Sequence, residues 1–211
     1  MKHWVSPTVV GAAVALAIVG AGGAGHTGVM LLAATGAVTF GDLTRRALAE
    51  RFARRRDPTD FWMSAAFALI LVGGAWDHGR DSMAEWPWEL EWVARLVGFA
   101  SIAAGVVLRR RAARALGANF LVRLGVREGH TLVQSGPYRS IRHPTYAALL
   151  AVAVGTSIAL GSVAALVVTV ALWLPIVFAR MSREERVLLR EFGEEYREYM
   201  ARTWRLVPGV V

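Results

Sequence analysis

Residues 144–180 read PTYAALLAVAVGTSIALGSVAALVVTVALWLPIVFAR, an apolar run with a few small polar side chains and one arginine at its end. Gly161-Ser162 divides this run into two stretches, and glycine followed by serine is a turn signal. Each stretch is near the lower limit of the ~17–25 residues that a helix needs to cross a bilayer. We therefore expect residues 144–160 and 162–180 to form a hairpin of two membrane helices.

Two further apolar stretches, residues 61–76 and 92–108, predict a second hairpin. The loop between them, residues 77–91, carries five acidic side chains, and tryptophans lie in and beside it. Residues 5–40 are apolar as well, and they form either one long tilted helix or a short hairpin broken at the glycines of residues 20–28. The expected fold class is an all-α, polytopic integral membrane helical bundle. It has five transmembrane helices, or six if residues 5–40 form a hairpin.

The distribution of charge predicts how these helices are oriented. The chain has a net charge of +8, and 21 of its 24 basic residues lie in four blocks, residues 45–56, 109–114, 123–142 and 180–205. The positive-inside rule assigns these blocks to the cytoplasm and the acidic loop to the opposite side. No aromatic and basic platform occurs in a soluble module, which argues against nucleic-acid binding. The absence of cysteine excludes disulfides and thiolate zinc sites.

Beyond residue 180 the helical pattern continues as an amphipathic cytoplasmic extension to Phe192. Gly193 interrupts this extension, residues 194–202 predict a second short helix, and Pro208-Gly209 is predicted to end the ordered region. The whole chain, residues 1–211, is predicted to be a single membrane domain.

The loop before Pro144 has the features of a shaped, electropositive site. Gly136-Pro137 is a turn signal, and Pro144 suits the first turn of a helix, where its missing N–H costs little. The free N–H groups at this helix start, with Arg142 and His143 beside them, suit a carboxylate or a phosphate.

Glu184 and Glu185 follow the last span by a few residues, so we expect them at the membrane depth of this loop. Carboxylates near the bilayer boundary need either an arginine bridge or a positively charged ligand. Both alternatives are open from the sequence.

The order and spacing of these motifs resemble the isoprenylcysteine carboxyl methyltransferase family and related membrane methyltransferases. The resemblance covers residues 115–208 and is carried by His130-x-Leu-Val-x-x-Gly-Pro-Tyr138, Arg142-His-Pro-x-Tyr146, Glu184-Glu185 and Phe192-Gly-Glu-Glu-Tyr-x-Glu-Tyr199-x-x-Arg202. Residues 1–114 match only in being transmembrane.

The resemblance implies an S-adenosylmethionine-dependent transferase, with residues 115–208 as the catalytic half and no metal. The cofactor pocket would be lined by His130, Leu132, Gly136, Tyr138, His143, Tyr146, Glu184 and Glu185. Arg142 and Arg202 would face the methyl acceptor or brace the pocket. His143 would serve as a base if the acceptor were a thiol or an amine. We also expect Arg142→Ala to spare folding and reduce turnover.

The resemblance leaves the acceptor open among a carboxylate, a thiol and an amine. A site at the cytoplasmic boundary favours a lipophilic or lipidated substrate that enters from the membrane lipid. The Ala-, Gly- and Arg-rich composition favours a bacterial inner membrane. Two alternatives are an NADPH-dependent membrane reductase related to sterol reductases and a non-catalytic membrane scaffold. The sequence does not decide the oligomeric state.

Overall fold

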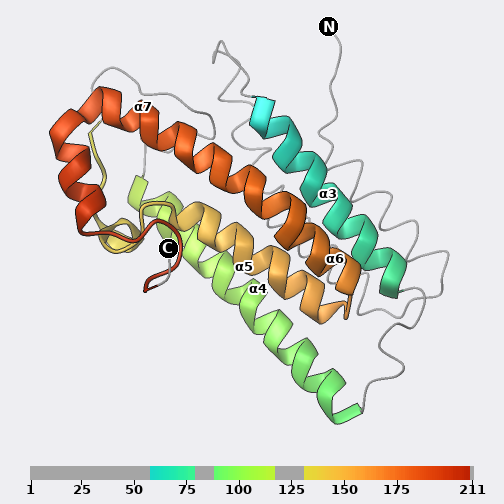
Figure 1. The fold of residues 1–211 in the computed structure, drawn as a ribbon. Helices are drawn as coiled ribbons and strands as arrows, with labels where there is room; N and C mark the ends of the chain where they lie inside the picture. The colour runs from blue at the N-terminus through green and yellow to red at the C-terminus, as the bar shows by residue number, and fades with distance from the viewer. Residues whose placement is uncertain (1–57, 79–87, 117–130, 210–211) are drawn as a thin grey trace, which may run out of the picture. The chain divides into compact units, whose positions relative to one another are not determined.

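The computed structural model describes residues 58–78, 88–116 and 131–209. Apart from one isolated parallel β-bridge between Ile141 and Trp204, the regular elements in these ranges are helices (Figure 1). His130 and the apolar stretch at residues 5–40 lie outside the described residues. The elements are α3 (Pro58–His78), α4 (Trp88–Leu116), the 3-10 turn η2 (Gly136–Arg139), α5 (Pro144–Ala159), α6 (Val163–Val168), the π-helical η3 (Thr169–Trp173) and α7 (Leu174–Ala201).

The four spans predicted between residues 61 and 180 are confirmed as helices in the described ranges. In these ranges two stretches, Leu90–Leu116 and Val163–Ala201, are long and apolar enough to cross a membrane. Helix α4 continues to Leu116, eight residues past the predicted end, because residues 109–116 are arginine, alanine and leucine, which favour helix. The total of five or six membrane helices stays a prediction.

The turn between α5 and α6 forms where the sequence predicts it. Gly161 has a φ of 64°, a conformation that a side chain would disfavour. Ser162 then caps α6, because its Oγ accepts a hydrogen bond from the amide of Ala165 at 3.0 Å. The same hydroxyl donates to the carbonyl of Gly73 at 3.4 Å, which ties the turn to α3.

The chain divides into two compact units that interleave along the sequence. Unit 1 combines Met1–Ala103 with Val152–Ile176, and unit 2 combines Ala104–Ala151 with Val177–Val211. The sequence predicts a different division, between N-terminal membrane helices in residues 1–114 and a catalytic half in residues 115–208. That division is by function, and it stays a prediction.

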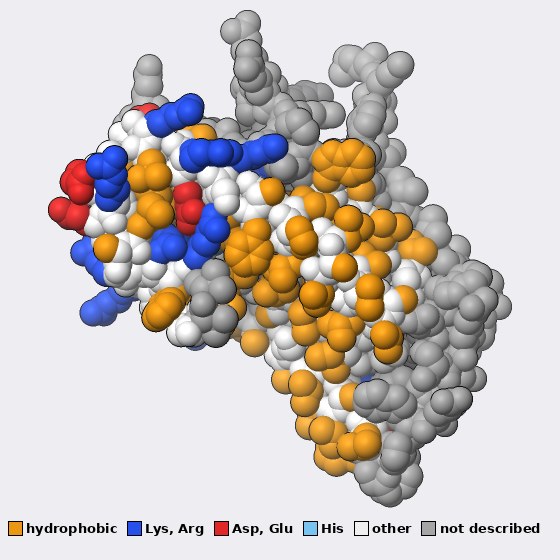
Figure 2. Space-filling view, viewed as in Figure 1, with side chains coloured by type: hydrophobic (Ala, Val, Ile, Leu, Met, Phe, Trp, Pro, Cys, Tyr) orange, Lys and Arg blue, Asp and Glu red, His pale blue; other side chains and the backbone are white. Residues whose placement is uncertain are grey.

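Unit 1 has a packed interior and an apolar exterior. Helix α3 packs against α6 and η3, and the rings of Phe67 and Trp173 lie 6.5 Å apart. On α4 the side chains of Trp92, Leu96 and Val97 are more than half exposed. Figure 2 shows hydrophobic side chains spread over the visible surface of these helices. Such a large apolar surface is typical of a protein whose surroundings are lipid.

Close packing of α4 and α5 within unit 1 depends on two glycines. A Cβ built on Gly98 would lie 2.6 Å from the nitrogen of Ala159 and 2.7 Å from the carbonyl oxygen of Gly155, so the two backbones approach directly. We expect Gly98→Ala to lower the free energy of unfolding by about 1–3 kcal/mol, measured by thermal unfolding in detergent.

Gly73→Ala is the matched control for this substitution. A Cβ at Gly73 would meet its nearest atom, the nitrogen of Ala165, at the ordinary contact distance of 3.7 Å. This variant should keep the wild-type melting temperature. Equal melting temperatures for the two variants would contradict the close approach at Gly98.

Candidate functional site

The loop before α5 belongs to unit 2 and folds into the predicted turn. Gly136 has a φ of 59°, η2 follows from Gly136 to Arg139, and α5 begins at Pro144. Tyr138 is buried in this loop, with its hydroxyl 3.5 Å from Oγ1 of Thr145. Burial raises the pKa of the Tyr138 phenol above its ordinary value of 10.0, so the side chain is neutral at physiological pH.

The C-terminal part of α7 turns back toward this loop. Gly193 has φ 52° and ψ −118°, which are non-helical values, and the ribbon bends sharply near this end (Figure 1). The interruption predicted at Gly193 is therefore confirmed. After the bend, the hydroxyl of Tyr199 donates to the carbonyl of Tyr138 at 2.7 Å. In Figure 2, charged side chains gather around this bent end of α7.

Residues 203–206, here termed the C-terminal strap, pair with the loop through backbone hydrogen bonds. The amide of Arg142 donates to the carbonyl of Trp204 at 2.8 Å, and the amide of His143 donates to the carbonyl of Arg205 at 3.2 Å. The amide of Trp204 donates back to the carbonyl of Ser140 at 2.9 Å. The strap therefore fixes the backbone directly before Pro144.

Glu185 lies beyond the apolar part of α7 and is bonded by two arginines and one histidine. Its Oε1 accepts from Nε of Arg142 at 3.3 Å and from Nε2 of His143 at 3.2 Å, and its Oε2 accepts from Nη2 of Arg205 at 2.8 Å. Burial raises the pKa of this carboxyl, but the hydrogen bond and electrostatic interaction with His143 and the charges of Arg205 and Arg142 outweigh burial and lower the pKa below 4.5. Glu185 is therefore ionised at neutral pH, and both of its carboxylate oxygens accept hydrogen bonds.

Glu184 has different surroundings, although it is the adjacent residue. It is half-buried, and its Oε2 accepts a hydrogen bond from the hydroxyl of Tyr146 at 3.0 Å. That hydroxyl in turn accepts from Nε of Arg180 at 2.6 Å. Among the described residues, no basic side chain forms an ion pair with Glu184. The acidic pair is thus split, because Glu185 takes the arginine bridges and Glu184 bonds to a phenol.

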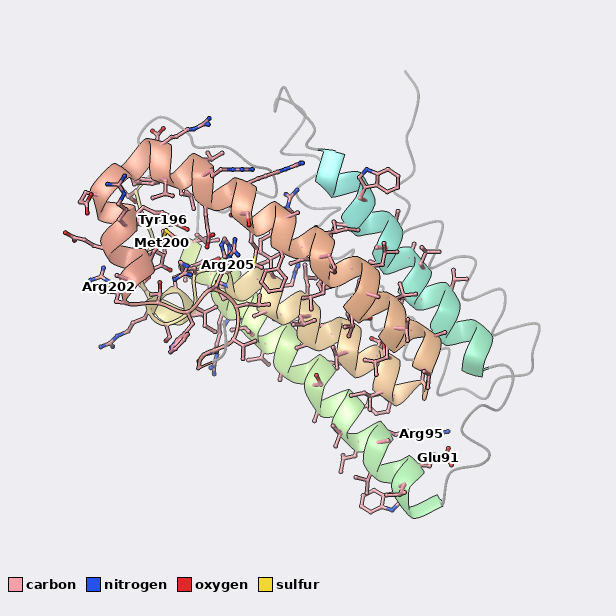
Figure 3. All side chains as sticks on the ribbon, in the orientation of Figure 1. Glu91, Arg95, Tyr196, Met200, Arg202 and Arg205 are labelled. Atoms are coloured by element: carbon pink, nitrogen blue, oxygen red, sulfur yellow. The ribbon has the colours of Figure 1, made fainter. Side chains whose placement is uncertain are left out.

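The two candidate acceptor-binding arginines occupy unlike positions. Arg142 is largely buried, and besides Glu185 its Nη1 donates to the carbonyls of Met200, at 2.8 Å, and Thr203. Of the two predicted roles for Arg142, this geometry matches the brace. Arg202 is exposed and donates to Oε1 of Gln134, at the outer edge of the bend (Figure 3).

The predicted convergence of the loop and α7 is confirmed by contacts between side chains about 40 residues apart. The structure brings together Tyr138, Arg142, His143, Tyr146, Glu184 and Glu185. Leu132 is half-buried and Gly136 is exposed in the same loop, whereas His130 lies outside the described residues. The functional role assigned to each of these residues stays a prediction.

Sequence reasoning missed several members of this network. Arg180 and Tyr196 are buried in it, and Arg205 joins it from the strap. From the sequence, Arg180 is only the end of a span and Arg205 only part of a basic block. Tyr196 and Tyr199 also form a buried pair on the bent end of α7, with ring centroids 5.8 Å apart.

Comparison with known proteins shows which proteins this chain resembles. A family model described as phospholipid methyltransferase matches residues 93–195. The probable protein-S-isoprenylcysteine O-methyltransferase of Oryza sativa subsp. indica is 29% identical over 168 residues, which cover 77% of this chain and 87% of that protein. The chain is thus similar to the protein-S-isoprenylcysteine O-methyltransferases. Together these matches identify the chain as a membrane methyltransferase.

Further relatives carry the same description. Protein-S-isoprenylcysteine O-methyltransferase B of Arabidopsis thaliana is 35% identical over 123 residues, covering 56% of this chain and 61% of that protein. A solved structure of the eukaryotic intramembrane Ras methyltransferase ICMT aligns with 95% of this chain and 98% of its own, at 19% identity and a TM-score of 0.49. Within the described ranges of this methyltransferase, no group of three His, Cys, Asp or Glu side chains is placed to hold a metal ion.

Proposed function

We propose that the chain transfers a methyl group from S-adenosylmethionine to a lipophilic acceptor at the cytoplasmic face of the membrane. The observation that carries this proposal is the unequal pairing of Glu184 and Glu185. Glu184 is a half-buried carboxylate that forms no ion pair with a side chain in the described ranges, and a bound cation would lower the cost of burying its charge. The sulfonium and ammonium groups of S-adenosylmethionine would supply such a cation beside Glu184.

The side chains around Glu184 fit a cationic nucleoside. The rings of His143 and Tyr146 lie 5.7 Å apart, and aromatic faces attract cations. We assign cofactor binding to Glu184, Tyr138, Tyr146 and His143, and by resemblance to His130, Leu132 and Gly136. When bound, S-adenosylmethionine would supply the methyl group on an activated sulfonium. The protein then has to orient the acceptor and exclude water.

Of the remaining predicted residues, Arg142 and Glu185 brace the site, whereas Arg202 is exposed to an acceptor. Arg142 and Glu185 form an ion pair with each other, which supports a bracing role for both. Arg202 is exposed, so it is the arginine of the predicted pair that an acceptor carboxylate can reach. An acceptor carboxylate is already ionised near pH 7 and needs no base. For a thiol or an amine, Nδ1 of His143 is the available basic nitrogen, because Nε2 donates to the carboxylate of Glu185.

The setting of the site supports a proposal for the acceptor and one for the compartment. The curated relatives are named for an isoprenylcysteine substrate, and we propose that this chain also takes a lipidated or lipophilic acceptor. The apolar surface of α4 supports entry of such an acceptor from the lipid. The four basic blocks support a cytoplasmic site, and the composition supports a bacterial inner membrane.

Calorimetry with the purified protein in detergent tests the cofactor assignment. We expect S-adenosylmethionine and its demethylated product to bind, and Glu184→Gln to raise the dissociation constant about tenfold, since a charge-assisted contact is lost. Glu191→Gln, an exposed glutamate on the same helix, should bind like the wild type. No heat at millimolar ligand, or binding of NADPH instead, would contradict the proposal.

Incubating membranes with a labelled methyl donor and a lipid extract then identifies the acceptor. We expect the label in a product that partitions into organic solvent. Label confined to water-soluble products would show that the acceptor is not lipophilic.

A further inference from the structure

Arg205 is the side chain that fastens the C-terminal strap to α7. Its Nη2 donates to Oε2 of Glu185 at 2.8 Å and to Oγ of Ser182 at 2.7 Å. Its guanidinium carbon lies 5.7 Å from the centroid of the Phe178 ring. These three partners lie on consecutive turns of α7, so Arg205 contacts about two turns of the helix. Figure 3 labels Arg205 apart from Arg202, which lies at the outer edge of the bend.

The backbone of the strap holds the loop that carries Arg142 and His143. Their amides bond to the carbonyls of Trp204 and Arg205, and the guanidinium of Arg142 donates to the carbonyl of Thr203. The strap therefore contacts the loop through its backbone and α7 through one side chain. If Arg205 lost its partners on α7, the strap and the loop would lose a shared anchor.

We propose that Arg205 is a positioning residue for methyl transfer, an inference that rests on the proposed function. It acts through Glu185 in two ways. First, it closes the strap, which sets the positions of His143 and Arg142. Second, it helps to neutralise Glu185, so that Glu184 is the carboxylate of the pair that meets the cofactor's positive charge. Without Arg205, the negative charge of Glu185 would keep only Arg142 and His143 as partners. Glu185 would then compete with Glu184 for the positive charge of the cofactor.

Amide hydrogen exchange, measured without cofactor, tests whether Arg205 holds the C-terminal strap to α7. In R205A we expect the amides of Arg142, His143 and Trp204 to exchange at least tenfold faster than in the wild type. R205K keeps the charge but lacks the planar fork that serves both Glu185 and Ser182, so protection should recover in part. R197A is the matched control, because Arg197 is exposed and pairs with exposed Glu194. Wild-type exchange in R205A would overturn the proposal.

Steady-state kinetics test the consequence for the reaction. We expect R205A to lower kcat at least tenfold while the KM for the methyl donor changes less than threefold, because Arg205 acts through Glu185 and does not touch the donor. R205K should recover most of kcat, and R197A should match the wild type. Faster exchange with an unchanged kcat would overturn the role in methyl transfer. If R205A does not fold, R205K carries the test, and wild-type exchange and kcat in R205K would overturn the proposal.

A double-mutant cycle tests whether Arg205 works through Glu185. In an E185Q background, adding R205A should change kcat less than twofold. Losses that multiply would overturn the pathway through Glu185. The exchange experiment needs no cofactor. A wild-type protein that shows the expected exchange pattern but binds no S-adenosylmethionine would therefore refute the proposed function and leave the fastening by Arg205 intact.

Discussion

Arg142→Ala should destabilise the protein by about 3–5 kcal/mol, as expected when one partner is removed from a buried charge network. Arg142 is bonded to Glu185 and to the carbonyls of Met200 and Thr203, so alanine would leave one carboxylate and two carbonyls without these donors. The expectation from sequence, that this substitution spares folding, conflicts with these contacts. Methyl transfer should be lost with the fold of this region. Thermal unfolding in detergent measures the effect.

Two controls separate the brace from a direct role in binding the acceptor. Arg139→Ala removes an exposed arginine three residues away and should leave the melting temperature unchanged. Arg142→Lys keeps the charge but cannot reach all three acceptors, so it should melt between the wild type and Arg142→Ala. A wild-type melting temperature for Arg142→Ala, together with lost turnover, would show instead that Arg142 faces the acceptor.

Glu185→Gln is the second substitution for which we expect a large effect, about 3 kcal/mol of lost stability. It leaves Arg142 and Arg205 without the carboxylate that both of them contact. Glu184→Gln should melt at or above the wild-type temperature, because Gln can still accept from the hydroxyl of Tyr146 and carries no half-buried charge. Thermal unfolding of the two variants side by side measures this contrast. Equal destabilisation by both would contradict the unequal roles assigned to the two glutamates.

The pH dependence of stability provides an independent check on Glu185. Its pKa is lowered in the folded protein, so its contribution to stability is fully present above the ordinary value of 4.5. That contribution is lost as the pH falls through the lowered value. The wild type should therefore lose more stability than Glu185→Gln on acidification below 4.5. Parallel curves for the two proteins would show that Glu185 is not stabilised as a carboxylate.

The sequence by itself determined the four helical spans, the start of α5, the turn after it and the bend of α7. The apolar runs, the glycines at 161 and 193 and the proline at 144 act locally, because each limits the backbone at its own position. The sequence also predicted that the loop before Pro144 meets the start of the extension beyond residue 180. Both segments adjoin the same membrane hairpin, so their depth follows from the lengths of the spans.

Only the tertiary structure decided how Glu184 and Glu185 divide their partners. Neighbouring residues on an α-helix point about 100° apart, so one glutamate can face the strap while the next faces Tyr146. The rotation of α7 about its axis settles which one does so, and this rotation depends on packing that no local pattern encodes. The roles of Arg142 as a brace and Arg205 as a fastener follow from that same packing, because their partners are distant in the sequence.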